Sequence, residues 1–249
     1  MLIRGRGISE GKARGKAVVL DSRVSFLGDV DPDTGSVNGR DIRDSILIFH
    51  SGIGSTVGSY VIYQLKRNGN APKAMINEST ETIVAAGSII SDIPLVDGIP
   101  IDIFKDGDVV EVNGTTGEVD LKGVKKQPVV TSFLMKDGKV LLVKRGDEVG
   151  SYKGRWSAIS GYMEDTPREQ AEKEIEEETG MEVDYISSGE PVYVRYKDKV
   201  WEVHPFIFKA KGAVKLNWEN IEYRWVKPEM IREMDTVPKL WEAYRSARS

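Results

Sequence analysis

Residues 156–181, W-S-A-I-S-G-Y-M-E-D-T-P-R-E-Q-A-E-K-E-I-E-E-E-T-G-M, decide the fold of the second half of this chain. Thr166 is followed three residues later by a glutamate, which is the pattern of a capping box, and Pro167 occupies the first helical position. Gly180 supplies a left-handed stop. The stretch therefore predicts a helix over residues 167–179.

Three glutamates of this helix share one face. Glu174, Glu177 and Glu178 have the spacing i, i+3 and i+4, which brings their carboxylates together. Such a cluster repels itself unless a cation neutralises it, and oxygen ligands favour Mg²⁺ or Mn²⁺. The triplet taken alone favours a solvated acidic helix instead.

The residues around the triplet favour the metal site. Residues 173–181, K-E-I-E-E-E-T-G-M, resemble the end of the Nudix box, R-E-U-x-E-E-x-G-U with U apolar. Residues 156–164 resemble the strand and glycine turn that lead into that box, and the resemblance extends over residues 128–249. It implies an α/β/α fold with a mixed sheet and a hydrolase that uses Mg²⁺ or Mn²⁺ to cleave a diphosphate substrate.

The resemblance also implies roles for particular residues. Glu174, Glu177 and Glu178 would bind the metal, and Glu177, Glu178 or a glutamate of a later loop would act as the base. For that later glutamate the sequence offers Glu219 and Glu222, with Glu222 as a further metal ligand and an ordinary surface role as the alternative for both. The substrate phosphates would be bound by Lys144 and Arg145.

Two departures from the Nudix pattern stand out. Lys173 replaces the usual arginine, which orients a box glutamate, and a lysine cannot reproduce its bidentate geometry. The turn between Gly161 and Thr166 is shorter than the family's usual turn. These departures leave an alternative open, in which the second half is a non-catalytic module that senses a nucleotide or isoprenoid phosphate.

A glycine-rich segment, residues 50–60 (H-S-G-I-G-S-T-V-G-S-Y), follows an apolar strand in the first half and runs into a helix. A strand, a glycine-rich turn and a helix N-terminus can bind an anion through free backbone N–H groups. The glycine spacing is G-x-G-x-x-x-G, which differs from the dinucleotide fingerprint, and no Walker lysine follows. A phosphate or carboxylate site and a structural tight turn remain equal alternatives on this pattern.

Several motifs of the first half resemble the small subunit of the aconitase X family, to which archaeal phosphomevalonate dehydratase belongs. They are G-S-T-V-G-S-Y at 54–60, G-N-A-P-K-A-M-I-N at 69–77 and I-P-L-V-D at 93–97. The resemblance implies a swivelling β/β/α domain that dehydrates (R)-5-phosphomevalonate together with a separate large subunit. Ser55 matches the family's proton acceptor, and Gly54 and Thr56 beside it would bind substrate. The iron–sulfur cluster would reside on the large subunit, since this chain has no cysteine.

The composition excludes several other classes of protein. The chain has 249 residues, a net charge of −4 and 40% hydrophobic residues, with no basic half that would indicate a nucleic-acid partner. It lacks an apolar run long enough for a membrane span, and its start lacks a signal peptide. We therefore expect a soluble, cytoplasmic protein with no nucleic-acid or membrane partner.

The expected organisation is two domains. The polar joint at residues 123–128 separates a swivel domain, residues 1–126, from a Nudix domain, residues 127–249. The predicted fold class is thus a swivelling β/β/α domain followed by an α/β/α Nudix fold. The first domain would bind an aconitase-X-like large subunit, or serve only as a partner-binding module, and the second would bind small phosphate or diphosphate substrates.

Overall fold

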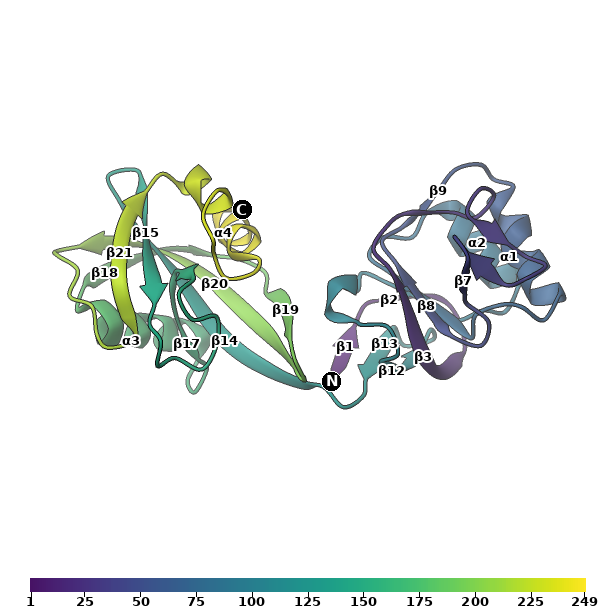
Figure 1. Ribbon diagram of the computed structural model, residues 1–249, viewed down its shortest axis with the longest axis horizontal. Helices are drawn as coiled ribbons and strands as arrows, with labels where there is room; N and C mark the ends of the chain where they lie inside the picture. The colour runs from purple at the N-terminus through teal and green to yellow at the C-terminus, as the bar shows by residue number, and fades with distance from the viewer. The chain divides into compact units, whose positions relative to one another are not determined.

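The computed structural model describes residues 1–249 and divides into two compact units, Met1–Lys125 and Lys126–Ser249. Each unit is built around an eight-stranded sheet of its own (Figure 1). The predicted fold class is confirmed, because each half contains its own sheet with helices packed against it, as described below for each unit by itself.

The sheet of the first unit has a parallel centre and antiparallel edges. Its four central strands run parallel to one another, and both β8 and β10 are buried at every residue, as expected for strands covered on both faces. In spatial order the strands are β1 (Leu2–Arg4), β13 (Glu118–Leu121), β12 (Val109–Asn113), β3 (Lys12–Leu20), β8 (Ile46–Phe49), β10 (Ala74–Asn77), β11 (Leu95–Asp97) and β2 (Arg6–Ser9).

Two helices, α1 (Gly58–Arg67) and α2 (Thr82–Ile90), pack against each other and contribute Ile62, Leu65 and Val84 to the core of this unit. Short ribbons complete it. They are the parallel pair β4 (Val24–Ser25) and β9 (Gly52–Ile53), the three-stranded set β5 (Val30–Asp31), β6 (Ser36–Val37) and β7 (Arg40–Asp41), and the 3₁₀ turn η1 (Ile101–Ile103).

The hairpin that closes the first unit contains the pair Asn113-Gly114, which is typical of a two-residue turn, but its loop is longer. β12 ends at Asn113 and β13 begins at Glu118, so four residues form the loop. The Asn113 side chain accepts hydrogen bonds from the backbone N–H groups of Thr115 and Thr116. The Asn113 side chain closes the loop at its start. Gly117, at the end of the loop, takes the left-handed conformation, with φ of 72°.

The sheet of the second unit begins with a hairpin around an Asp-Gly pair. β14 (Lys125–Lys136) and β15 (Lys139–Arg145) meet at Asp137 and Gly138, whose φ angles of 50° and 72° suit a tight two-residue turn. The remaining strands are β16 (Trp156–Ser157), β17 (Ile159–Tyr162), β18 (Glu182–Ser188), β19 (Val192–Tyr196), β20 (Lys199–Lys211) and β21 (Asn220–Val226). The main path runs β16-β15-β14-β20-β18, and β17, β19 and β21 pair with β14, β20 and β15.

Alternating side chains give this sheet two apolar faces. Leu141 and Val143 of β15 belong to the core under α3 (Pro167–Thr179), whereas Val140 and Leu142 belong to the core under α4 (Leu240–Arg248). Successive side chains of a strand point to opposite faces, so both faces are covered and the sheet lies between helices. The 3₁₀ turn η2 (Pro228–Arg232) joins the α4 side through Ile231.

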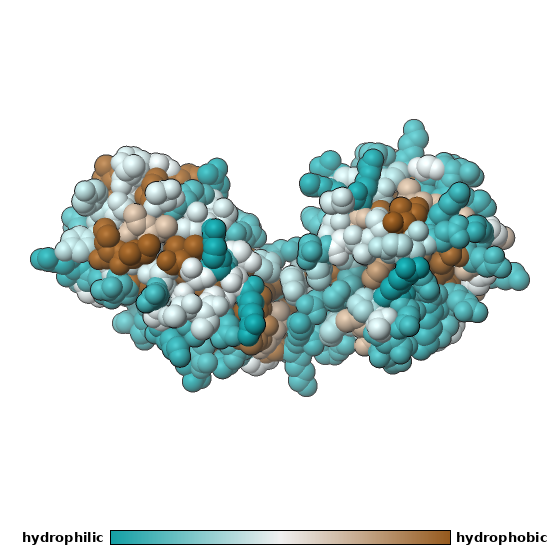
Figure 2. Space-filling view, turned by 180° about the vertical axis from the view of Figure 1, so that it is seen from behind, coloured by the Kyte–Doolittle hydropathy of each residue, from teal (hydrophilic) through white to brown (hydrophobic).

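On the face shown in Figure 2, each unit is largely hydrophilic, with apolar residues exposed as separate patches. No helix combines the length and the apolar character needed to cross a membrane.

Candidate functional site

The acidic helix α3 has the bounds that the sequence predicts, and it ends at Gly180 with φ of 61°. Its beginning differs from the expected capping box. The Thr166 side chain makes no hydrogen bond to the backbone of the helix, and its hydroxyl donates instead to the Glu169 carboxylate. The two side chains of the box thus satisfy each other, while Pro167 needs no partner because it lacks an N–H group.

Glu178 is the most buried of the three box glutamates, with an exposed fraction of 3%. One of its oxygens accepts a hydrogen bond from the Ser160 backbone N–H at 3.1 Å, and the other accepts one from the Asn220 side-chain amide at 2.6 Å. Burial raises the pKa of Glu178 to about 8, because the charged form loses its hydration. A buried carboxylate of this kind needs a cation nearby to be stable in its charged form.

Glu174 is half-buried and lies against the strand that precedes the helix. A Cβ atom added to Gly161 of β17 would come within 1.8 Å of its Oε1 atom, so any larger residue would displace this carboxylate from its present position. The same oxygen accepts a hydrogen bond from the Gln170 side-chain amide at 2.7 Å. Burial raises the pKa of Glu174, against the smaller opposing effect of that hydrogen bond.

Glu177 is exposed and lines, together with Glu174, a pocket of about 460 Å³. Glu219, from the loop before β21, enters the same pocket. Arg145 and Lys173 also line it and bring positive charge. The pocket therefore combines acidic side chains that suit a cation with basic ones that suit an anion.

The acidic side chains of this pocket fit a hard divalent cation, because the metal ligands that they offer are all carboxylate oxygens. As the side chains stand, no group of three or more His, Cys, Asp or Glu residues converges closely enough to hold a metal ion. In this arrangement Gln170 bonds one oxygen of Glu174, and Ser160 and Asn220 bond the two oxygens of Glu178.

The structure separates Glu222 and Lys144 from this pocket. Neither residue lines it, and the Glu222 carboxylate lies 2.7 Å from the Arg224 guanidinium and 4.0 Å from the Lys144 ammonium. Of the two later glutamates that the sequence offers, Glu219 is the one beside the box glutamates. The sequence predicts Glu222 as the further metal ligand. In the structure the loop before β21 instead places Glu219 in the pocket.

Aromatic rings form one wall of the same pocket. Tyr162 and Trp201 line it with ring centroids 5.8 Å apart, and Tyr152 lines it beside Tyr196, at 4.9 Å. Trp218 also lines the pocket and is 66% exposed, so its ring has a free face. No motif in the sequence predicts this wall. The signal that could have indicated it is Trp218, which directly precedes Glu219 in the sequence.

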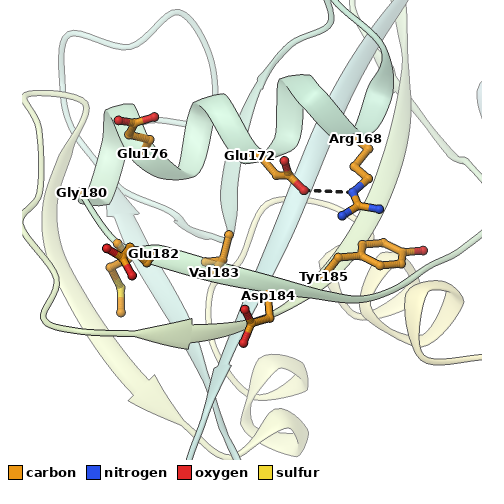
Figure 3. Close-up of a pocket in the computed structure, with 9 residues that line it drawn as sticks. Arg168, Glu172, Glu176, Gly180, Glu182, Val183, Asp184 and Tyr185 are labelled. Carbon is orange, nitrogen blue, oxygen red and sulfur yellow. Dashed lines mark hydrogen bonds and ion pairs between the residues drawn. The ribbon is translucent and has the colours of Figure 1, made fainter.

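A larger pocket, of about 720 Å³, lies between α3 and β18 (Figure 3). The one cation that lines it, Arg168, already pairs with Glu172 at 2.9 Å and lies 4.5 Å from the centre of the Tyr185 ring. Its other charged lining residues are Glu176, Glu182 and Asp184. The predicted metal-binding residues Glu174 and Glu177 line the smaller pocket and not this one, so the smaller pocket is the candidate site.

In the first unit, the glycine-rich segment connects β9 to α1 as an exposed loop. Gly54 has φ of 108°, which only glycine adopts readily, and Ser55 and Thr56 follow it on the surface. The Ser55 hydroxyl accepts a hydrogen bond from the Val57 backbone N–H at 3.4 Å, and its carbonyl accepts one from Gly58 at 2.9 Å. The three predicted residues are thus adjacent and accessible, at the N-terminal end of a helix.

His50 lies just before this loop, between two carboxylates. Its Nδ1 atom is 2.7 Å from Glu78 and its Nε2 atom is 3.1 Å from Asp21. The hydrogen bond to Glu78 raises the pKa of His50, and the contact with Asp21 adds to this effect. The loop is anchored separately, because the Gly52 N–H donates to the Glu81 carboxylate at 2.6 Å.

Comparison with known proteins assigns a family to each unit. Residues 2–121 match the aconitase X swivel domain, and residues 125–247 match the NUDIX domain. Over 129 residues the chain is 52% identical to the phosphomevalonate dehydratase small subunit of Methanosarcina acetivorans, covering 48% of this chain and 90% of that protein. For the same subunit of Thermococcus sibiricus the identity is 48%, over 49% of this chain and 99% of the relative.

Solved structures resemble each unit separately. Aconitase X of Thermococcus kodakaraensis in its holo-form is 50% identical over 49% of this chain and 98% of that chain, with a TM-score of 0.48. The MutT protein of Methanosarcina mazei is 26% identical over 52% of this chain and 97% of that chain, with a TM-score of 0.44. Through its first unit, which is 52% identical to a relative that it covers to 90%, this chain belongs to the aconitase X swivel-domain family, and residues 125–247 of its second unit match the NUDIX domain.

Proposed function

We propose that the second unit is a hydrolase that cleaves the diphosphate linkage of a nucleoside diphosphate-type substrate. One observation carries this proposal: Glu174, Glu177 and Glu219 line the same pocket as Arg145 and a wall of aromatic rings. Carboxylates suit a divalent cation, arginine suits a phosphate, and aromatic rings stack on a planar base.

In this proposal the reaction is the attack of a water molecule on a phosphorus atom, with release of a phosphate or a nucleotide. Mg²⁺ or Mn²⁺, when bound by Glu174, Glu177 and Glu178, would neutralise the phosphates and lower the pKa of the water. Glu177 and Glu219 are open to the pocket and can take the proton of the attacking water. Arg145 donates to the Ser151 carbonyl at 2.9 Å, which fixes its side chain beside the phosphates.

The test is a panel of diphosphate compounds incubated with the full chain and Mg²⁺. We expect Glu177→Gln to lower turnover of the accepted substrate at least about 100-fold, as for loss of a base or metal ligand. Glu176→Gln is the matched control, because Glu176 is exposed on the same helix but does not line this pocket. Equal turnover in both variants would refute the assignment, and binding without turnover by the unmodified chain would favour a sensing module.

For the first unit we propose that it acts as the small subunit of a phosphomevalonate dehydratase. The supporting observation is its 52% identity to a protein of that name over 129 residues. In this proposal a separate large subunit carries the iron–sulfur cluster, Ser55 accepts a proton of (R)-5-phosphomevalonate, and Gly54 and Thr56 bind the substrate. The exposed position of Ser55 leaves its hydroxyl accessible to a substrate held by the partner.

Ser55→Ala tests this role once the chain is assembled with a large subunit. We expect dehydration to be lost while assembly and melting temperature are retained, because one exposed hydroxyl contributes little to an interface of ordinary size. Ser59→Ala removes a hydroxyl that bonds the Thr56 carbonyl in the same segment and serves as the control. Normal turnover in Ser55→Ala, with a melting temperature lowered by loss of about 1 kcal/mol, would make Ser55 only a helix cap.

A further inference from the structure

The Nudix box of this chain lacks the arginine that orients a metal-binding glutamate, and its lysine does not replace it. The Lys173 ammonium pairs with Glu164 at 3.8 Å, and its side chain also lines the pocket of about 460 Å³ that contains Glu174 and Glu177. The hydrogen bond to the Glu174 carboxylate comes from another residue, Gln170, one turn earlier in the same helix. The orientation of Glu174 therefore has a different source in this protein.

Gln170 is buried, with an exposed fraction of 2%, and both ends of its amide are engaged. Its Oε1 atom accepts hydrogen bonds from the backbone N–H groups of Glu164, at 3.2 Å, and Asp165, at 3.3 Å. Its Nε2 atom donates to Glu174 Oε1 at 2.7 Å. Backbone N–H groups only donate, so the amide oxygen must face the turn and the amide nitrogen must face Glu174.

The shortened turn makes this arrangement possible. It brings Glu164 and Asp165 over the first turn of α3, where a side chain at position 170 can reach both N–H groups. Glu174 is then held from two sides, by Gln170 and by the close approach of Gly161. Only its Oε1 atom takes part in the bond to Gln170, which leaves Oε2 for a cation.

We propose that Gln170 is the positioning residue for Glu174 and replaces the arginine of the Nudix box, while Lys173, which lines the pocket, faces the substrate phosphates. This inference rests on the proposed metal-dependent hydrolysis by the second unit. It also connects the two departures from the Nudix pattern, since the shorter turn supplies the anchor for the residue that does the work of the missing arginine.

Mn²⁺ affinity of the full chain, measured from the electron paramagnetic resonance signal of the free ion, tests the proposal without relying on activity. Gln170→Met keeps the length and burial of the side chain but removes all three hydrogen bonds of its amide. We expect it to weaken Mn²⁺ binding by about 10-fold to 100-fold, as for other residues that orient metal ligands, and high Mn²⁺ to restore kcat. Lys173→Met should change Mn²⁺ affinity less than about twofold, while it raises KM for the substrate.

The variants separate the possible outcomes. Unchanged Mn²⁺ affinity in Gln170→Met, or an equal loss in Lys173→Met, would overturn the role of Gln170 while leaving the metal site intact. Failure of the unmodified chain to bind Mn²⁺, or full binding by Glu177→Gln, would refute the proposed function and this inference with it. If Gln170→Met does not fold, Gln170→Asn keeps an amide but retracts it by one methylene, and the same loss of affinity is expected.

Discussion

The buried carboxyl of Glu178 makes the stability of the metal-free second unit depend on pH. Burial raises its pKa from an ordinary value of 4.5 to about 8 in the folded protein. The folded state therefore holds a proton that the unfolded state releases at a lower pH. The stability that this proton contributes is fully present below about pH 4.5 and is lost as pH rises through about 8.

The size of the effect follows from the two pKa values. Each tenfold change in proton affinity is worth about 1.4 kcal/mol, so the difference amounts to roughly 5 kcal/mol when the titration is complete. Between pH 5 and pH 7 we expect the free energy of unfolding to fall by roughly 3 kcal/mol, and by about 4 kcal/mol by pH 9. Such a change is a large fraction of the stability of an ordinary domain.

Urea unfolding in the presence of a chelator, followed by tryptophan fluorescence, measures this effect in the full chain. All five tryptophans lie in the second unit, so the signal reports on that unit alone. Glu178→Gln has no titrating proton and should lose this part of the pH dependence. Its amide nitrogen can donate to Asn220 once the Asn220 amide turns over, so the buried site remains satisfied.

Glu176→Gln is the control for this experiment, because Glu176 is exposed on the same helix and should leave the pH dependence unchanged. Parallel stability curves for the unmodified chain and Glu178→Gln between pH 5 and pH 9 would refute the argument from burial. A loss of pH dependence in both variants would refute the assignment to Glu178.

Three further predictions concern other parts of the chain. Gly161→Ala should displace the flexible carboxylate of Glu174 and lower Mn²⁺ affinity at least about tenfold, while the free energy of unfolding changes by less than about 1 kcal/mol. Unchanged Mn²⁺ affinity would contradict the close approach of Gly161 to Glu174. Residues 1–125 and 126–249, expressed separately, should each unfold cooperatively, and aggregation of both would indicate a shared core. NMR titration of His50 should give a pKa above its ordinary value of 6.5. The contribution of His50 to stability is then present below pH 6.5 and is lost as the pH rises through the raised pKa, and a measured pKa at or below 6.5 would refute this prediction.

The sequence by itself determined the features that depend on neighbouring residues. The bounds of α3, its left-handed end at Gly180 and the Asp137–Gly138 hairpin were all predictable, because proline fixes the local φ angle and glycine readily adopts the positive φ angles that turns and helix ends need. Both family resemblances were visible in the sequence as well, because their motifs are short and contiguous. The capping box failed as a prediction at Thr166, where two competing side chains bonded each other rather than the backbone.

The tertiary structure alone decided which side chains meet in the candidate site. Glu219 and Glu222 are equivalent in the sequence, but the loop before β21 turns the first towards the box glutamates and pairs the second with Arg224. Gln170 has no motif of its own, and its role depends on a turn folded back over the helix. Contacts between residues on different elements depend on how those elements pack, and that packing is set by the cores on both faces of the sheet rather than by local sequence.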